Sequence, residues 1–471
     1  MRRLAKKNAP LAKRRKRIQH SNDKQISPHL NTQVQSTHII TYLPLISNNL
    51  LATNTLKPYL QNKKAMNIKD FTKDPEVLEL IAKIKSKNPK VSDTLDDQGN
   101  QYVDIVMEGG GVLGIALVGY TYALEQAKIK FCSLAGTSAG AINAMMLASV
   151  KPTKYVTISE ELIDIISNKN FFDFVDGEPY VKKIIKDVLS EQPMIWVGIK
   201  NLFNIGKLIR LIKEELGLNE GKNFEDWVKN ILETHQINTT SDLQNHRNTV
   251  ASQLKLKEGV TGNTVFASKI AIIASDVTTQ TKVEFPLHKE LYFKNSYEVS
   301  PSKYVRATMS IPLFFKPFTV QNLPTNQETL WKDTVGYEGE IPKKINFVDG
   351  GTLSNFPINV FHLSAGVPRK PTFGVRLGKD RQKFNSIKTF LKYFFAIFNT
   401  MRYLHDYDFL LKNRDYKHLI GMIDTDGHNW LNFDITDEEK LDLFKRGVRA
   451  AADFLEKFDW EGYKKLRGAL G

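Results

Sequence analysis

Cysteine is nearly missing from this chain of 471 residues, which contains Cys132 alone. A single cysteine cannot form an intrachain disulfide, and this usage is typical of proteins from reducing compartments. Long apolar runs are missing as well: no stretch approaches about 20 uninterrupted apolar residues, so we predict no transmembrane helix. The N-terminus lacks the compact apolar segment and cleavage site of a conventional signal peptide. We expect a cytoplasmic or peripheral membrane location, with non-classical secretion left open.

Acidic residues are missing from the first 17 positions, which hold nine Lys or Arg out of a chain with a net charge of +15. Residues 1–65 are otherwise rich in Asn, Gln, Ser and Thr, a composition that predicts a mostly disordered tail. Three roles are open for it: a solvated arm, a contact with anionic membranes, or a nucleic-acid or nuclear-targeting patch. Aromatic residues are not interleaved with the basic ones, so no specific nucleic-acid partner is expected.

Glycine, in contrast, is clustered in short motifs that lie between strand-like and helical runs. Residues 136–140 read G-T-S-A-G, the pattern G-x-S-x-G, between the apolar run 129–135 and a helical run rich in Ala and Met. A strand that turns sharply into a helix at a serine is a nucleophile elbow, which exposes the hydroxyl at a helix N-terminus. Ser138 is therefore the candidate nucleophile, and Gly136 and Gly140 are the small residues that let the backbone turn.

An earlier glycine cluster, E-G-G-G-V-L-G at 108–114, lies between the strand-like run 102–107 and the helical run 115–126. A nucleotide phosphate cradle is the alternative for such a loop, because amides at a helix N-terminus bind any anion. However, no G-x-x-x-x-G-K-[ST] is present, and the G-x-G-x-x-G match is weak alone. With a serine elbow on the next strand, the amides of Gly110 and Gly111 are better interpreted as an oxyanion hole.

A carboxylate that could act as the base follows the strand-like run 345–348. Asp349 opens a D-G-G segment, and we expect it at the carboxyl end of the sheet, where open α/β sheets bind ligands. The alternative is an ordinary D-G turn. None of the ten histidines lies in a glycine-rich or loop-like catalytic context. The runner-up within the enzyme class, a histidine-dependent triad on an α/β-hydrolase fold, would use one of four residues: His362, His405, His418 or His428.

In this order, the three glycine-containing motifs at 109–114, 136–140 and 349–351 resemble those of the patatin-like phospholipase family. The resemblance covers about residues 102–365 and implies a three-layer α/β/α fold with a central, mainly parallel sheet, a helical insertion after the elbow and an α-rich C-terminal extension. It implies that Ser138 and Asp349 form a Ser–Asp dyad. The resemblance also assigns the oxyanion hole to Gly109, Gly110 and Gly111, with motif support from Gly114, Gly136, Gly140, Gly350 and Gly351.

The activity that this resemblance implies is hydrolysis of lipid carboxylic esters, of phospholipase A or lysophospholipase type, without a metal or organic cofactor. The substrate would be a phospholipid or another lipid ester, met at a peripheral membrane surface; whether a protein partner activates the enzyme is open. One departure concerns Leu113, which stands where the family often has an Arg or Lys that helps stabilise the oxyanion loop. Either packing holds the loop, or the activity is weaker or tuned to another ester. The alternative function is a catalytically weak or inactive patatin-fold module that binds lipid or protein.

The chain divides by composition into four predicted parts: a basic tail at 1–65, a helical lead-in at 66–101, a catalytic domain at 102–365 and a C-terminal extension at 366–471 packed on that domain. Within the catalytic domain, residues 159–262 form the predicted helical insertion and a possible lid.

Two interpretations are open for the insertion. Its apolar run 194–203 is followed by Lys207, Arg210 and Lys213 at helical spacing, which suits an ordinary amphipathic helix on the core or an interfacial helix at a lipid surface. The polar stretch 235–262 is predicted to be a loop.

The C-terminal extension predicts further regular structure. Residues 372–377 read as a strand and 387–411 as an aromatic-rich helix. A capping box, with Thr436 as N-cap and Glu439 at the third helical position, predicts a helix that runs to about Phe458.

Overall fold

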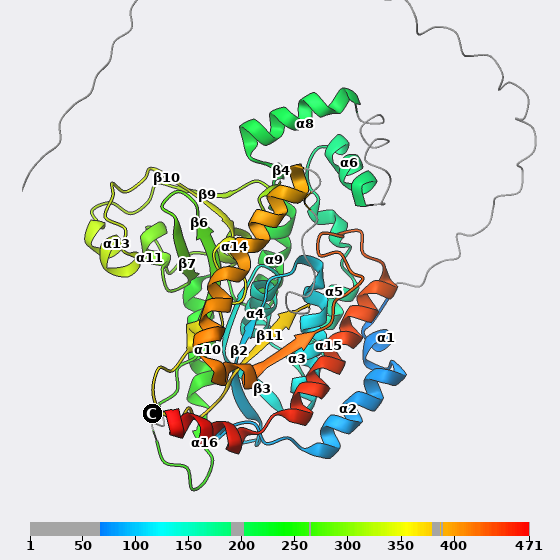
Figure 1. Ribbon diagram of the computed structural model, residues 1–471, viewed down its shortest axis with the longest axis vertical. Helices are drawn as coiled ribbons and strands as arrows, with labels where there is room; N and C mark the ends of the chain where they lie inside the picture. The colour runs from blue at the N-terminus through cyan, green and yellow to red at the C-terminus, as the bar shows by residue number, and fades with distance from the viewer. Residues whose placement is uncertain (1–65, 190–201, 263–264, 379–386, 388–389, 471) are drawn as a thin grey trace, which may run out of the picture. The chain divides into compact units, whose positions relative to one another are not determined.

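The computed structural model describes residues 66–189, 202–262, 265–378, 387 and 390–470. The predicted basic tail lies outside these described residues, and so does most of the apolar run 194–203. All described residues belong to one structural unit, Lys64–Gly471 (Figure 1).

A central sheet carries the fold, and its middle strands are parallel. In spatial order its strands are β12 (Ile420–Ile423), β11 (Thr372–Leu377), β2 (Gln101–Met107), β3 (Ile129–Thr137), β6 (Ile270–Asp276), β10 (Lys344–Asp349) and β9 (Phe318–Gln321). The first five run parallel to their neighbours, whereas β10 is antiparallel to both β6 and β9. The predicted, mainly parallel sheet is confirmed.

The remaining strands are β1 (Thr94–Leu95), β4 (Gly217–Asn219), β5 (Lys255–Leu256), β7 (Thr281–Phe285) and β8 (Leu313–Phe315). Three of these short strands, β1, β5 and β7, extend the central sheet, because β1 pairs with both β2 and β5, and β7 pairs with β6, whereas β4 and β8 form a separate two-stranded sheet. The described helices are α1 (Ile68–Thr72), α2 (Pro75–Lys87), α3 (Gly114–Gln126), α4 (Ala139–Ser149), α5 (Ile158–Ser167), α6 (Pro179–Leu189), α8 (Leu202–Glu215), α9 (Lys222–Thr234), α10 (Thr240–Ser252), α11 (Lys289–Tyr292), α12 (Ser302–Thr308), α13 (Glu328–Val335), α14 (Phe390–Lys412), α15 (Asp437–Lys457) and α16 (Trp460–Leu470). Five 3₁₀ turns are described: η1 (Gly111–Leu113), η2 (Phe171–Phe174), η3 (Gly350–Thr352), η4 (Ile358–Phe361) and η5 (Arg414–Leu419).

The core forms because helices cover both faces of the parallel strands. Every residue of β2 is buried, as expected for a parallel strand covered on two sides. Helix α3 is apolar around its circumference and packs against α15 (Figure 1). Glycine allows this close crossing: a Cβ at Gly119 would lie 2.1 Å from the Phe444 carbonyl oxygen, and one at Gly447 would lie 1.9 Å from that of Ala116.

The C-terminal residues contribute directly to the sheet, because β11 pairs with β2 and β12 pairs with β11. The predicted strand 372–377 is confirmed with the same bounds. The capping box of Thr436 and Glu439 is confirmed as well, and α15 begins directly after it. Within the described ranges, no helix combines the length and the apolar content needed to cross a lipid bilayer.

The prediction of a loop over 235–262 was wrong, because this stretch contains α10. A capping box starts the helix, with the Thr239 side chain accepting from the Asp242 amide. The helix is polar for a packed element, and its buried face includes a charged residue, Arg247, which is only 3 % exposed. The Arg247 guanidinium is satisfied by the backbone carbonyls of Phe131 and Cys132, at 2.9 and 2.7 Å. An apolar-periodicity argument therefore could not find this helix.

Candidate active site

The turn between β3 and α4 holds Ser138 in a strained backbone conformation. Its φ of 50° and ψ of −120° belong to a region that L-residues rarely adopt. Larger residues would clash at both flanking glycines. A Cβ at Gly136 would lie 2.3 Å from the Gly140 carbonyl carbon, and one at Gly140 would lie 2.1 Å from the Met107 carbonyl oxygen. The Ser138 amide donates to Thr308 Oγ1 at 2.9 Å, which fixes the elbow against α12.

The structure brings Asp349 beside this elbow, by a different route from the one we expected. Asp349 is the last residue of β10, which runs antiparallel to β6 rather than parallel to it. Asp349 pairs with Ala274, and the preceding β6 residue, Ile273, pairs with Thr137 at the end of β3. Strand β10 therefore enters from beyond the carboxyl ends of the parallel strands and stops level with the elbow.

The Asp349 carboxylate is buried and hydrogen-bonded. Its Oδ1 accepts the Gly351 amide at 2.7 Å, and the nearby Ser138 side chain acts to lower its pKa. On another side, Ser138 Oγ lies 3.3 Å from Met309 Sδ. Burial raises the pKa of Asp349 above its ordinary value, while the positive charge of Arg402 and the hydrogen bonds act in the opposite direction. A buried carboxylate with a raised pKa is suited to accept a proton near neutral pH.

The glycine loop lies against the same serine, since a Cβ at Gly109 would approach Ser138 Cβ to 3.2 Å. The Gly109 amide is committed to the Asn355 carbonyl at 3.0 Å, so it is not available to an oxyanion. The amides of Gly110 and Gly111 donate to no group in the described part of the chain. Gly111 has a φ of 55°, and this backbone region favours glycine.

Arg402, on α14, is a residue of this site that sequence reasoning missed. Its side chain is 7 % exposed, and Nη2 donates to the Gly109 carbonyl at 3.1 Å and to Asn355 Oδ1 at 2.7 Å. No motif marks it, because it stands on an aromatic-rich helix far along the chain from the glycine loop. Leu113, where the family often has a cation, is itself buried in the hydrophobic core.

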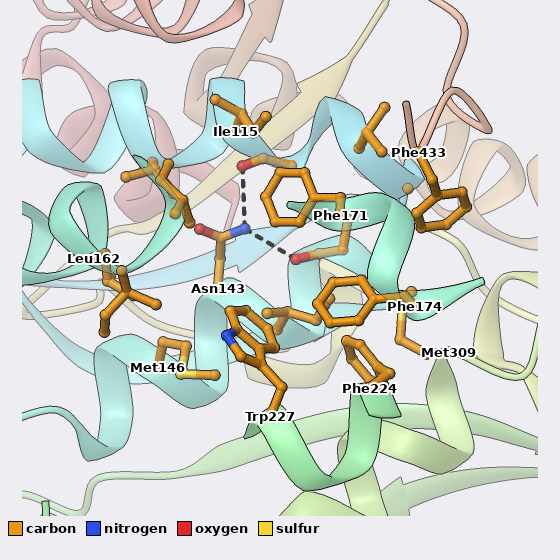
Figure 2. Close-up of a pocket in the computed structure, with 18 residues that line it drawn as sticks. Ile115, Asn143, Met146, Leu162, Phe171, Phe174, Phe224, Trp227, Met309 and Phe433 are labelled. Atoms are coloured by element: carbon orange, nitrogen blue, oxygen red, sulfur yellow. Dashed lines mark hydrogen bonds between the residues drawn. The ribbon is translucent and has the colours of Figure 1, made fainter. Parts of the chain in front are cut away.

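An apolar cavity of about 70 Å³, partly open to solvent, adjoins the elbow (Figure 2). Its walls are formed by residues from the glycine loop, α3, α4, α5, η2, α9 and two later segments: Gly111, Val112, Gly114, Ile115, Val118, Ala139, Ile142, Asn143, Met146, Leu162, Ile165, Ile166, Phe171, Phe174, Phe224, Trp227, Met309 and Phe433. The side-chain Nδ2 of Asn143, a polar atom in this lining, donates to the backbone carbonyls of Gly114 and Ala139, at 3.2 and 3.0 Å (Figure 2). The cavity therefore suits an apolar chain.

Two of the four histidines considered for a triad, His362 and His428, have other described partners. His362 Nδ1 lies 2.9 Å from Tyr416 Oη, and His428 Nε2 lies 2.8 Å from Asp442 Oδ2. The side chain of His405 is outside the described residues. The described hydrogen bonds of His362 and His428 thus do not involve Ser138.

A mainly parallel sheet, a strained serine between strand β3 and helix α4, and a carboxylate at the end of β10, which is separated from β3 by β6 alone, define an α/β protein with a nucleophile elbow. The family model for patatin-like phospholipases matches residues 105–362, more than half of the chain. The chain therefore belongs to the patatin-like phospholipase family, a family of esterase- or lipase-type hydrolases.

Individual proteins that are similar to this chain differ widely from it in sequence. The uncharacterized protein YqhO of Bacillus subtilis (strain 168) is 29% identical over 363 residues, which cover 76% of this chain and 100% of that protein. The crystal structure of VipD from Legionella pneumophila aligns with a TM-score of 0.37 and 16% identity, covering 78% of this chain and 70% of VipD. The ExoU–SpcU complex from the type III secretion system of Pseudomonas aeruginosa aligns with a TM-score of 0.30 and 15% identity, covering 76% and 51%.

Proposed function

We propose that this chain is a lipid acyl hydrolase of phospholipase A or lysophospholipase type. One observation carries the proposal: the strained Ser138, directly after β3, lies beside the buried Asp349 at the end of β10 and acts on the pKa of its carboxyl group. A strained, buried serine beside a carboxylate has no evident structural purpose, whereas nucleophilic catalysis requires a nucleophile within reach of a base.

In the proposed reaction, Ser138 Oγ attacks the ester carbonyl carbon while Asp349 accepts the hydroxyl proton. The amides of Gly110 and Gly111, together with the N-terminus of α4, stabilise the oxyanion of the tetrahedral intermediate. Collapse of this intermediate breaks the bond to the alcohol oxygen, which takes the proton from Asp349. Water, deprotonated by Asp349, then attacks the acyl-enzyme carbonyl carbon, and collapse of this second intermediate breaks the bond to Ser138 Oγ. Ser138 Oγ takes the proton back from Asp349, which releases the fatty acid and restores both residues.

The acyl chain of the substrate would occupy the apolar cavity. Ala139 follows Ser138 in the chain, and Met309 contacts its hydroxyl; both line the cavity. An acyl group bonded to Ser138 would therefore enter it directly. Burial of each methylene would contribute about 0.8 kcal/mol to binding, so the cavity favours long acyl chains over short ones.

A peripheral membrane surface is the proposed source of the substrate. The basic residues of the tail lie outside the described residues, but α8 presents Lys207, Arg210 and Lys213 with exposed side chains. These cations would face anionic headgroups if α8 contacted a bilayer. The proposed roles of α8 as a lid or an interfacial helix rest on this charge and on the sequence alone.

Labelling with a fluorophosphonate probe tests the hydrolase function without knowledge of the natural substrate, since it requires only an activated serine. We expect wild-type protein to be labelled at Ser138, and Ser138→Ala and Asp349→Asn to lose both labelling and fatty-acid release. Ser149→Ala, at the other end of α4, and Asp276→Asn, another buried carboxylate at a strand end, are matched controls that keep both.

The competing functions give different results in the same experiment. An inactive lipid- or protein-binding module leaves Ser138 unlabelled in folded wild-type protein. A histidine-dependent triad makes one of His362, His405, His418 or His428 essential, whereas the dyad predicts that replacing each of them preserves turnover.

A further inference from the structure

The carbonyl of Gly109, in the glycine loop, accepts two side-chain hydrogen bonds. It accepts Asn355 Nδ2 at 3.1 Å and Arg402 Nη2 at 3.1 Å, while the Gly109 amide donates to the Asn355 carbonyl at 3.0 Å. Arg402 also donates to Asn355 Oδ1 at 2.7 Å. The peptide that begins the loop is therefore fixed by one arginine and one asparagine.

The orientation of this peptide decides where the next amide points. The Gly109 carbonyl and the Gly110 amide belong to one planar trans peptide unit, so they point in opposite directions. A donor that holds the carbonyl on one side directs the N–H to the other. A cation at the carbonyl also polarises the unit, which makes the N–H a stronger donor. Arg402 thus lies at the opposite pole of the peptide whose amide is proposed to bind the oxyanion.

Arg402 also lies beside the turn that follows the base. A Cβ at Gly351 would lie 3.2 Å from Arg402 Nε and 2.9 Å from Asp349 Oδ1, so the guanidinium and the carboxylate flank the same residue. The charge of Arg402 counteracts the effect of burial on the pKa of Asp349. One side chain is therefore connected to both halves of the site, the oxyanion loop and the base.

A second residue from the same region of the chain supports this contact. The Arg402 guanidinium carbon lies 5.4 Å from the centre of the Trp430 ring, a cation–π distance. The Trp430 carbonyl accepts the Val112 amide at 3.1 Å. Both residues lie beyond residue 362, where the match to the family model ends. The glycine loop is thus held in part by residues outside the segment that matches the family model.

We propose that Arg402 is a positioning residue of this site, which orients the Gly109–Gly110 peptide toward the oxyanion and supplies from α14 the cation that the motif lacks at Leu113. The inference rests on the proposed function, because it assigns Arg402 a role in the same reaction. It also resolves the departure noted at Leu113: the loop is held by hydrogen bonds from a distant cation, and loss of catalysis does not follow from the leucine.

The test compares Arg402→Met, which removes the charge, with Arg402→Lys, which keeps it, in the full chain. A matched control is Arg247→Met, because Arg247 is another buried arginine that donates to backbone carbonyls. Its partner Cys132 is six residues before Ser138 on an extended strand, about 20 Å from the elbow. Hydrolysis of a soluble short-chain ester is measured against pH, with all rates corrected for the folded fraction.

We expect Arg402→Met to lower kcat by about tenfold or more with little change in KM, since the lost interaction acts on the transition state. The acid limb of its pH–rate profile, where the rate falls as pH falls, should move to higher pH. The reason is that loss of the cation leaves the Asp349 pKa raised further. Arg402→Lys should keep the wild-type limb and lose less kcat. Hydrogen exchange of residues 109–114 should be faster in Arg402→Met than in wild type.

Equal kcat in Arg402→Met and wild type would overturn the proposal, and so would a loss matched by Arg247→Met without movement of the acid limb. If Arg402→Met does not fold, a shifted acid limb in Arg402→Lys overturns it instead. Failure of the function itself is seen separately: wild-type protein then shows no Ser138-dependent turnover, and hydrogen exchange of the glycine loop still reports whether Arg402 holds it.

Discussion

At the scale of single residues, the site sets two opposing demands on Asp349. The carboxylate must be ionised to accept a proton, but its burial disfavours the ionised form and raises its pKa. Arg402 and the Gly351 amide partly restore the charged form. The balance leaves a carboxylate that is a stronger base than an exposed aspartate.

This balance predicts the pH dependence of hydrolysis. Activity requires deprotonated Asp349, so kcat/KM should fall as pH falls through its raised pKa. The midpoint of this acid limb should lie above about 3.9, the value for an unperturbed aspartate. Initial rates on a neutral short-chain ester between pH 4 and 9 measure it, with circular dichroism at each pH to exclude unfolding. A midpoint at or below the ordinary aspartate value would contradict the assignment of Asp349 as the base.

At the scale of elements, α4 connects Ser138, the proposed nucleophile, to the apolar cavity. Ala139, Ile142 and Met146 line the cavity from one side of this helix. Met146 is eight residues from Ser138, which corresponds to about 12 Å along the helix axis. The helix therefore places Met146 where the distal part of a long acyl chain would lie.

Met146→Trp should shorten the acyl chains that the enzyme accepts. The larger side chain would fill the distal cavity and leave the elbow unchanged, so turnover of short-chain esters should persist while turnover of long-chain esters falls tenfold or more, in line with the loss of about two buried methylenes. Rates on a series of p-nitrophenyl esters of increasing length measure this. A uniform loss at all lengths would place the acyl chain elsewhere; Met422→Trp, an exposed methionine on β12, is the control.

The elements also separate what could be predicted from the sequence from what could not. The elbow, the glycine loop and the D-G-G turn were predictable because each depends on neighbouring residues in the chain. Helix α10 was missed because its buried Arg247 is satisfied by partners on β3. Arg402 was missed for the same physical reason: its role depends on contacts with Gly109 and Asn355, which only the tertiary structure brings together.

At the scale of the whole molecule, we propose that the basic tail contributes to membrane binding and that the described unit carries the chemistry. The basic tail belongs to Met1–Lys63, a separate unit from Lys64–Gly471, which contains every residue of the candidate site. The direction of β10, the strand that ends at Asp349, could not be predicted from the sequence, because it depends on the antiparallel pairing of β10 with β6 in the assembled sheet. The tail, in contrast, is described by its charge alone.

Deletion of residues 1–25 should therefore weaken binding to anionic vesicles without affecting the chemistry. Each cation near an anionic surface contributes about 1 kcal/mol, and salt screens this contribution. Co-sedimentation with vesicles containing phosphatidylserine, at low and high salt, measures the effect, and hydrolysis of a soluble ester should be unchanged. Binding that is identical with and without the tail at both salt concentrations would leave it as a solvated arm or a targeting signal.

The backbone at Ser138 has a consequence for the evolution of this chain. Its φ and ψ match the first central position of a type II′ turn, which glycine occupies without strain. The free energy of unfolding of Ser138→Gly should therefore exceed that of Ser138→Ala by about 1–3 kcal/mol of relieved strain, less the added chain entropy. Ser138→Gly should accordingly unfold at a higher temperature, while both variants lack turnover. Differential scanning calorimetry of the two variants measures the difference, and equal stability would argue against strain. If selection for hydrolysis ceased, a single substitution of Ser138 by glycine would make the protein more stable. The serine is therefore expected to persist only while its hydroxyl is under selection.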